Sequence, residues 1–445
     1  MSDFPDLDST WSWVVMVATF VSLFVIGGTN YTVGLVHNIL LDKYNESQTA
    51  TAWVGAVHSS VSNLAAPLSS LLIDQFSVRV AMMTGGILYT VGFLSTAFVP
   101  SIGLSILTFG IIAGLGGATG WTASMLAPNF HFEKYRNLAV GISFSGIGAG
   151  MFGVPPVVSW TAEHYGSFGF FVALACVSAQ FIVCGMVASP SSLETHSRTV
   201  RHANYKRGPN RGILSTYSKV ITTKVVLCYT FSMLTYGFGM YTIFVFLPVY
   251  CIRQGSTDMQ ASYVLSICGM STIFGRILTG FIANFKSVNE IILYGGSLVI
   301  ITILTVLFPL YSANITGQIV YAVLFGLFFG CPYVTITPIN LSFLGVGHIS
   351  AALGIELCGC GAGGIIGPIL AGLLADSGGS FSHVFILAGI SIGVSALLGF
   401  IPLMFHGQNQ GDAHLAISVD VKEEDNQLET VKEKMLKSDD ESSVT

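Results

Sequence analysis

The chain has 445 residues, of which 52% are hydrophobic and only 9% are charged, with 50 glycines and a formal net charge of −5. A soluble chain of this length needs far more charge to cover its surface, so the composition excludes a soluble globular protein and indicates a membrane protein. We find no nucleophile–base pair, phosphate-binding loop or metal-ligand spacing. The sequence therefore argues against an enzyme, a cofactor, a metal site or a nucleic-acid ligand.

Twelve apolar runs, each about 20 residues or longer, predict transmembrane helices. They lie at 13–40, 50–73, 80–98, 102–128, 138–160, 166–189, 223–251, 258–284, 290–309, 313–341, 350–375 and 382–405. The first run is too long, and is followed by too many others, to be a cleaved signal peptide. We predict an all-α polytopic membrane protein made of an amino-terminal segment 1–12, a six-helix half 13–189, a central loop 190–222, a second six-helix half 223–405 and a tail 406–445.

The basic residues are distributed unequally between the two sides of these spans. With alternate crossings, one side receives only Lys43 and Arg253, whereas the other receives Arg79, Lys134, Arg136, Arg198, Arg201, Lys206, Arg207, Arg211, Lys219, Lys224 and Lys286. The positive-inside rule then places both termini and the central loop in the cytoplasm, and we expect the plasma membrane. The tail after about Gly407 contains ten acidic residues and few large apolar ones, so we expect it to be disordered.

A stretch of seventeen residues in the fifth span recurs 213 positions later, in the eleventh span. Ala139 to Pro155 and Ala352 to Pro368 share Ala, Gly, Ile, Gly, Gly, Ala, Gly and Pro in the same register. The small residues predict faces on which a neighbouring helix backbone packs closely: Gly141, Gly146 and Gly150 in one copy, Gly354, Gly359 and Gly363 in the other. Two like halves are typical of secondary transporters that hold their substrate between the halves, near the bilayer midplane.

A weaker repeat occurs at the turn between the second and third span of each half. Ile73-Asp74-Gln75-Phe76 matches Ile282-Ala283-Asn284-Phe285, and a Gly-Gly pair follows each of them. The first of these turns resembles the signature loop of the major facilitator superfamily, although its middle, Gln-Phe-Ser-Val, departs from the usual pattern. The resemblance implies that Asp74 and Arg79 cap helix ends and latch one conformation.

Two further segments resemble signatures of the monocarboxylate transporter family. Residues 132–141, Phe-Glu-Lys-Tyr-Arg-Asn-Leu-Ala-Val-Gly, look like the segment that enters the family's fifth span, and Asp8-Ser9-Thr10-Trp11-Ser12-Trp13 looks like the motif before the first, with Ser9 replacing a Gly. The resemblance covers all twelve spans. It implies the major facilitator fold, alternating access, a small organic carboxylate or related solute as substrate, and a single-pass immunoglobulin-type glycoprotein as ancillary partner.

Few ionisable residues lie deep in the spans, where such groups are costly and usually face a cavity or a partner. Arg276 in the eighth span is the strongest candidate for binding substrate, because a guanidinium stays charged and its planar fork suits a carboxylate. Its position also matches the substrate-binding Arg of the resembled family. The alternative is that Arg276 lies near the cytoplasmic end and snorkels to the interface.

Two departures from the resembled family concern proton coupling. Proton-coupled lactate carriers have an Asp one turn before this Arg and a Lys in the first span, four residues after a Tyr. Here these positions hold Thr272 and Leu35. Because neither side chain can bind and release a proton during transport, we expect facilitated diffusion, or coupling through a different group.

Glu356 in the eleventh span is the candidate for that different group, because an apolar environment favours its protonated form near neutral pH. It is either a proton relay or a structural residue, permanently protonated or paired with Arg276. His58 either lines the pocket or is satisfied by a neighbouring helix carbonyl. The further substrate-binding candidates are Tyr31, Asn30, Asn63, Phe329 and Tyr333. The alternative for Phe329 and Tyr333, in the tenth span, is packing, which is the usual role of Phe and Tyr in transmembrane helices.

These patterns predict a secondary transporter of the plasma membrane, either facilitative or atypically proton-coupled. The alternative is a transporter-like sensor or scaffold that binds a solute without turnover. Intact Gly-rich segments in both halves favour continued motion and hence transport.

Overall fold

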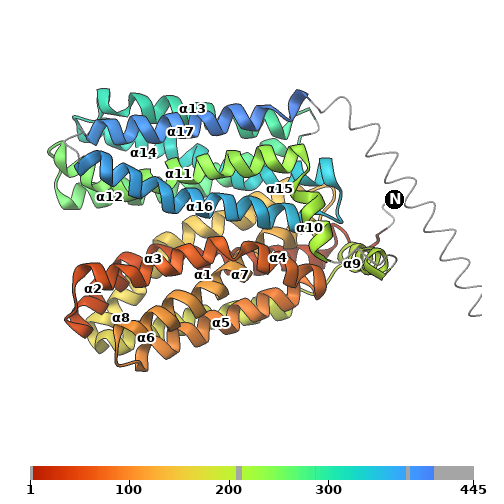
Figure 1. Ribbon diagram of the computed structural model, residues 1–445, viewed down its shortest axis with the longest axis horizontal. Helices are drawn as coiled ribbons and strands as arrows, with labels where there is room; N and C mark the ends of the chain where they lie inside the picture. Colours follow the sequence, from red (N-terminus) through yellow and green to blue (C-terminus); the bar gives the residue numbers. More distant parts are fainter. Residues whose placement is uncertain (1–3, 207–212, 286, 377–380, 405–445) are drawn as a thin grey trace, which may run out of the picture.

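The computed structural model describes residues 4–206, 213–285, 287–376 and 381–404. The first half comprises α1 (Thr10–Tyr31), α2 (Val33–Tyr44), α3 (Gln48–Leu64), α4 (Ala66–Gln75), α5 (Val78–Phe98), α6 (Ile102–Ser105), the π-helix η1 (Ile106–Ala113), α7 (Gly114–His131) and α8 (Arg136–Val187). The second comprises α11 (Lys224–Arg253), α12 (Asp258–Ala283), α13 (Glu290–Tyr311), α14 (Ile315–Phe329), α15 (Cys331–Leu344), α16 (Ile349–Asp376) and α17 (Phe381–Phe400). The halves form two layers joined through α9 (Ser192–Lys206) and α10 (Ile213–Ile221) (Figure 1).

The prediction of an all-helical membrane protein is confirmed, and the breaks within its helices have local causes. In the described residues, ten helical segments are long and apolar enough to cross a membrane. The longest, α8, contains Gly166 in a left-handed conformation (φ 66°), which bends it into two crossings. The second span is divided at Ala65 into α3 and α4, and its serines and Asn63 lower its hydropathy. With these two, the described residues provide the twelve predicted spans.

The repeated glycines lie against backbone of the same half. A Cβ at Gly146 would overlap the carbonyl oxygen of Phe20, and one at Gly150 that of Phe24, both in α1. In the second copy, a Cβ at Gly359 would lie 2.8 Å from the carbonyl oxygen of Thr230 in α11, and one at Gly363 would overlap that of Leu234. The first glycine of each copy instead faces the other half: Gly141 packs on α12, and Gly354 on α4.

The two halves are hydrogen-bonded at the end of the molecule that carries α9, termed here the α9 end. The Ser350 hydroxyl in α16 donates to Asp74 Oδ1 in α4, and the Asn137 amide in α8 donates to the Ala283 carbonyl over 2.6 Å. Tyr217 of α10 hydrogen-bonds Ser70 at 2.8 Å. In Figure 1, α9 and α10 lie at one end of the two layers, and α2 and α12 extend to the opposite one.

The amino-terminal segment holds two helix starts at the α9 end. Asp8 accepts hydrogen bonds from the backbone N–H groups of residues 133, 134 and 135, at 3.2, 2.9 and 3.3 Å, ahead of α8. Asp6 accepts from the backbone N–H of Ser192, at the start of α9, over 2.7 Å. Burial opposes ionisation of Asp6, but the Ser192 hydrogen bonds outweigh it and lower the pKa of this carboxyl. Both carboxylates lie where the helix dipole favours negative charge.

Candidate functional site

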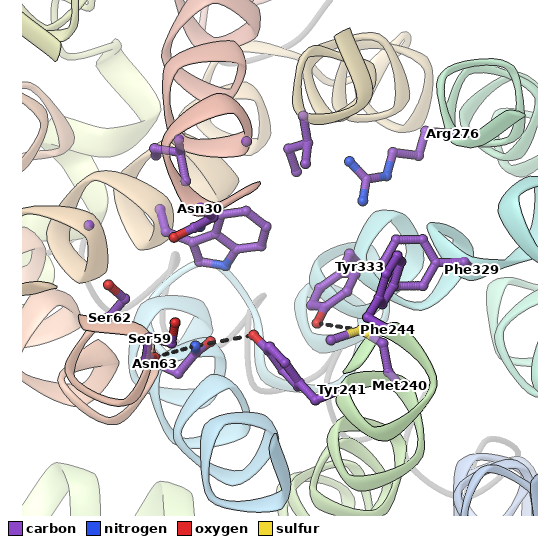
Figure 2. A pocket seen from close by; sticks show the side chains of 15 residues that line it. Asn30, Ser59, Ser62, Asn63, Met240, Tyr241, Phe244, Arg276, Phe329 and Tyr333 are labelled. Atoms are coloured by element: carbon purple, nitrogen blue, oxygen red, sulfur yellow. Dashed lines mark hydrogen bonds between the residues drawn. The ribbon is translucent and has the colours of Figure 1, made fainter. Parts of the chain in front are cut away.

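A cavity of about 240 Å³ lies between the halves. Fifteen residues line it: Ile26, Gly27, Asn30, Ser59, Ser62, Asn63, Gly117, Trp121 and Ile147 from the first half, and Met240, Tyr241, Phe244, Arg276, Phe329 and Tyr333 from the second. Arg276 is the one charged residue among them. In Figure 2 its guanidinium lies on one side of the cavity, across from Ser59, Ser62 and Asn63.

Arg276 is held at the boundary of the two halves by groups from both. Its side chain is 1% exposed, and its Nη1 donates a hydrogen bond of 2.7 Å to the Phe144 carbonyl in α8. The guanidinium carbon lies 5.6 Å from the centroid of the Phe329 ring, within the range of a cation–π contact. Gly330, between α14 and α15, leaves room for the Arg276 stem, because a Cβ there would overlap it. The guanidinium thus lines the cavity while buried, rather than snorkelling.

The opposite side of the cavity is polar and uncharged. The Asn63 Nδ2 donates to the Ser59 carbonyl at 2.9 Å and to the Tyr241 hydroxyl at 3.2 Å, so this hydrogen bond connects α3 with α11. Ser62 donates to the Gly114 carbonyl at 3.2 Å. Asn30, near the end of α1, faces the same space (Figure 2). This side suits a hydrogen-bonding group better than a charge.

Aromatic rings form the wall between these two sides. The Tyr333 ring is edge-on to that of Trp121 at 5.9 Å and to that of Tyr236 at 5.7 Å. Phe329 and Phe244 pack edge-on at 5.2 Å. The sequence patterns had not indicated Trp121, yet a Trp in mid-span is itself a signal, since this residue favours the membrane interface.

A family model described as the Major Facilitator Superfamily matches residues 15–355. The chain belongs to this superfamily. It is similar to bovine (Bos taurus) monocarboxylate transporter 13, with 25% identity over 86% of this chain and 87% of the relative. It is also similar to chicken (Gallus gallus) monocarboxylate transporter 4, with 28% identity over 88% and 82%. These matches confirm the predicted resemblance: the protein is a monocarboxylate-transporter-like member of the superfamily.

The fold comparison agrees with this assignment. The structure is similar to that of an E. coli fucose:proton symporter, with a TM-score of 0.65 and 16% sequence identity, covering 87% of this chain and 98% of the symporter. The predicted major facilitator fold is therefore confirmed. The protein is a secondary transporter that spans the membrane several times.

Not every residue predicted for the substrate site of this superfamily member lines the cavity. His58 is fully buried among the rings of Tyr89, Phe93 and Phe109, and its Nδ1 lies 3.1 Å from the Phe109 carbonyl. That carbonyl belongs to the π-helix η1, whose altered backbone pairing exposes carbonyl groups to other partners. His58 therefore follows the alternative of a histidine satisfied by a helix carbonyl. The side chain of Tyr31 lies outside the described part of the chain.

The two positions that differ from the proton-coupled pattern hold side chains occupied in packing. Leu35, in α2, is half-buried against the hydrophobic core. The Thr272 hydroxyl, one turn before Arg276, donates to the Cys268 carbonyl at 3.0 Å and is 3% exposed. Neither is an ionisable group beside the guanidinium.

Glu356 is hydrogen-bonded to Asn340 of α15, not to Arg276. Its side chain is 0% exposed, and its Oε2 accepts from the Asn340 Nδ2 over 2.6 Å. The remaining oxygens of the pair, Glu356 Oε1 and Asn340 Oδ1, are both buried without a hydrogen-bond partner among the described residues. Buried acceptors without a donor are costly, and a proton on the Glu356 carboxyl would supply one.

The α4–α5 turn is held by more groups than the signature pattern implied. Asp74 is buried and accepts from Ser350 and, at 3.4 Å, from the Tyr217 hydroxyl. Arg79 lies exposed at the start of α5. It is α9 that binds the turn: the Glu194 carboxylate accepts from the Val78 N–H at 2.8 Å, and the Arg198 guanidinium donates to the Phe76 carbonyl.

Proposed function

We propose that this protein is a plasma-membrane carrier that moves a small organic carboxylate by alternating access. The observation that carries the proposal is Arg276, the one charged side chain lining a cavity between two like halves. A guanidinium binds a carboxylate through two parallel hydrogen bonds, and the low dielectric of a buried site strengthens them. The printed names of the relatives, monocarboxylate transporters, support the same substrate class.

The positive-inside rule supports a cytoplasmic α9 end, because Arg79, Lys134, Arg136 and Arg198 all lie there. Both termini and the loop 190–222 are then cytoplasmic. Since Ser350 and Asn137 hydrogen-bond the halves together at this end, and Tyr217 of the connecting α10 hydrogen-bonds Ser70, we infer a conformation closed to the cytoplasm. In an alternating-access cycle these bonds break when the substrate is released inward. A single-pass immunoglobulin-type glycoprotein remains our proposal for a trafficking partner.

We further propose that transport is facilitative. Leu35 and Thr272 are not ionisable, so neither of these two positions can couple a proton to the bound anion. Glu356 fits a structural role: with a proton on Oε1 it donates to Asn340 Oδ1 while Oε2 accepts from Nδ2, and both orphaned oxygens are satisfied. Such an acid–amide pair fastens α16 to α15 without a net charge.

The test is uptake of labelled lactate, pyruvate, aromatic amino acids, creatine and thyroid hormone by cells expressing the protein. We expect saturable flux of a carboxylate that falls about ten-fold or more in Arg276→Ala at equal surface level. Arg253→Ala is the matched control, because Arg253 lies at the opposite end of the bundle against Phe381 and outside the cavity. Saturable binding with no net or exchange flux would instead support a sensor.

A further inference from the structure

The apolar side of α10, the second helix of the central loop, is packed on the second half of the molecule. Tyr217 and Val220 of α10 belong to a hydrophobic cluster whose other described members all come from that half. These are Val226 of α11, Leu344 of α15, and Ala351, Ala352 and Ile355 of α16. Val220 is 4% exposed, and Tyr217 is half-buried. The burial of this apolar surface holds α10 against α11 and α16.

The hydroxyl of Tyr217 reaches the first half. It lies 2.8 Å from the Ser70 Oγ and 3.4 Å from Asp74 Oδ2, both in α4. The Ser70 hydroxyl also lies 2.9 Å from the Pro67 carbonyl oxygen. Gly354 of α16 leaves room for this junction, because a Cβ there would overlap the Ser70 Oγ. One helix of the loop is therefore packed on the second half and hydrogen-bonded to the first.

Two hydrogen-bond arrangements keep Tyr217 joined to α4. A tyrosine hydroxyl has one proton to donate. Tyr217 donates either to Ser70, which then donates to the Pro67 carbonyl, or to Asp74, in which case Ser70 donates to Tyr217. Loss of the Ser70 hydroxyl leaves Asp74 as an acceptor, whereas loss of the Tyr217 hydroxyl removes both connections. Tyr217 is therefore the residue on which the connection between α10 and α4 depends.

We propose that α10 is a clasp that holds the α9 end closed, with Tyr217 as the residue that fastens it. When the halves separate at this end, α10 cannot stay packed on α16 and hydrogen-bonded to α4 at once, so the clasp opens in each cycle. The inference rests on the alternating access of the proposed function. It adds that the loop between the halves, outside the repeated segments, biases the equilibrium between the closed and open conformations.

The experiment measures the separation of the halves at the α9 end, without any solute. Glu133 of the first half and Ser342 of the second are exposed and line the cavity at this end. Nitroxide labels on Glu133→Cys and Ser342→Cys therefore report the width of that cavity by pulsed electron paramagnetic resonance. Cys176, an exposed native cysteine, is replaced by Ser in every variant. We expect a shorter distance from the closed conformation and a longer one from the open conformation.

Tyr217→Phe keeps the ring and removes only the hydroxyl. We expect it to raise the ratio of open to closed molecules about three- to ten-fold, which is the net effect of one hydrogen bond. Ser70→Ala should change the ratio little, because Tyr217 then donates to Asp74. Tyr263→Phe is the matched control, because Tyr263 is 53% exposed and lies in the first turns of α12, at the opposite end of the bundle (Figure 1).

Val220→Ala tests the packed side of the clasp independently of the hydroxyl. It reduces the contact of α10 with α16, so it should raise the same ratio by a smaller factor. An unchanged ratio in Tyr217→Phe, or an equal change in Tyr263→Phe, would overturn the inference. A lower thermal midpoint in Tyr217→Phe with unchanged distances would also overturn it, because Tyr217 would then have a purely structural role.

Failure of the proposed function gives a different result, since the distances are measured without a transported solute. If the parent protein transports none of the acids but the distances shift in Tyr217→Phe, the clasp is supported in a protein that is not a carrier. If the parent transports an acid and the distances stay the same in Tyr217→Phe, the clasp is refuted and the carrier is not.

Discussion

The Gly-rich parts of α8 and α16 make equivalent contacts with different atoms. Within each half they meet backbone, of α1 in one case and of α11 in the other. Across the halves they differ: a Cβ at Gly141 would lie 2.6 Å from the Arg276 carbonyl oxygen and 2.8 Å from the Gly280 Cα, whereas one at Gly354 would meet the side chain of Ser70. At Gly141 the contact is therefore backbone on backbone, whereas at Gly354 the nearest atoms belong to a side chain that can move, and the Ala66 carbonyl oxygen lies farther off, 3.1 Å from such a Cβ.

This difference indicates different roles for the Gly-rich parts of α8 and α16 during transport. Backbone cannot yield without bending a helix, so the α8–α12 contact next to Arg276 keeps the spacing of the halves constant. The α16–α4 contact lies beside the Asp74–Ser350 hydrogen bond, which must open during transport. A pseudo-symmetric pair of helices thus provides one rigid and one adjustable contact.

The largest expected effect comes from the contacts that both copies share. Gly150→Ala and Gly363→Ala each place a methyl group onto a carbonyl oxygen of a neighbouring helix, and we expect a loss of about 3 kcal/mol or more of stability in either variant. The measurement is the yield and thermal midpoint of the purified protein. Gly296→Ala is the control, because a Cβ there has no atom within 4 Å. Equal behaviour of all three variants would contradict close packing.

A smaller effect should distinguish the two contacts between the halves, at Gly141 and at Gly354. We expect Gly141→Ala to change the free-energy difference between the closed and open conformations by about 1 kcal/mol or more, because only backbone atoms face Gly141. Gly354→Ala should change this difference less. Ser342→Cys, in the cavity that also contains Asn137 and Asn284 at the α9 end, reports opening through its rate of modification by an impermeant maleimide.

The contact between Gly354 and Ser70 can be tested with a compensating variant. Ser70→Gly combined with Gly354→Ala should return the maleimide rate to that of the parent, since it removes the side chain in the way. No such rescue is expected for Gly141→Ala. If Ser70→Gly restored both single variants equally, the distinction between a rigid and an adjustable contact would be wrong.

The smallest expected effect concerns the residues that occupy equivalent places in the two Gly-rich copies, Ser143 and Glu356. Ser143 donates to the Met16 carbonyl at 3.5 Å, whereas the equivalent Glu356 pairs with Asn340. Glu356→Gln keeps both hydrogen bonds of a protonated acid–amide pair, so we expect little change in flux and, in the parent, only weak stimulation by an inward proton gradient. Uptake at matched internal pH measures this. Strong stimulation that vanishes in Glu356→Gln would make Glu356 a proton relay.

The sequence predicted most of the fold because hydropathy and repeat register are local properties. The spans follow from apolar runs, and the 213-residue repeat located both Gly-rich helices. The charge of Arg276 within a span indicated a residue that faces a cavity or a partner, and Arg276 lines the cavity.

Other parts of the site depend on helix rotation and on tertiary partners, which one sequence does not specify. His58 lies against the Phe109 carbonyl of η1, a contact between two spans that the sequence of neither span specifies. Asn340 is sixteen residues from Glu356, in a different helix, so their pairing had no sequence signal. The binding of the α4–α5 turn by Glu194 and Arg198 likewise depends on where α9 folds back.

Asp8 brings the two segments that resemble family signatures into direct contact. Its carboxylate binds the backbone N–H groups of residues 133–135 and none of their side chains. This contact therefore sets no requirement on the side chains of those three residues, although the Tyr135 ring packs on that of Trp13, whereas position 8 must keep a short acceptor side chain. Related sequences should therefore keep a short acidic side chain at the position of Asp8.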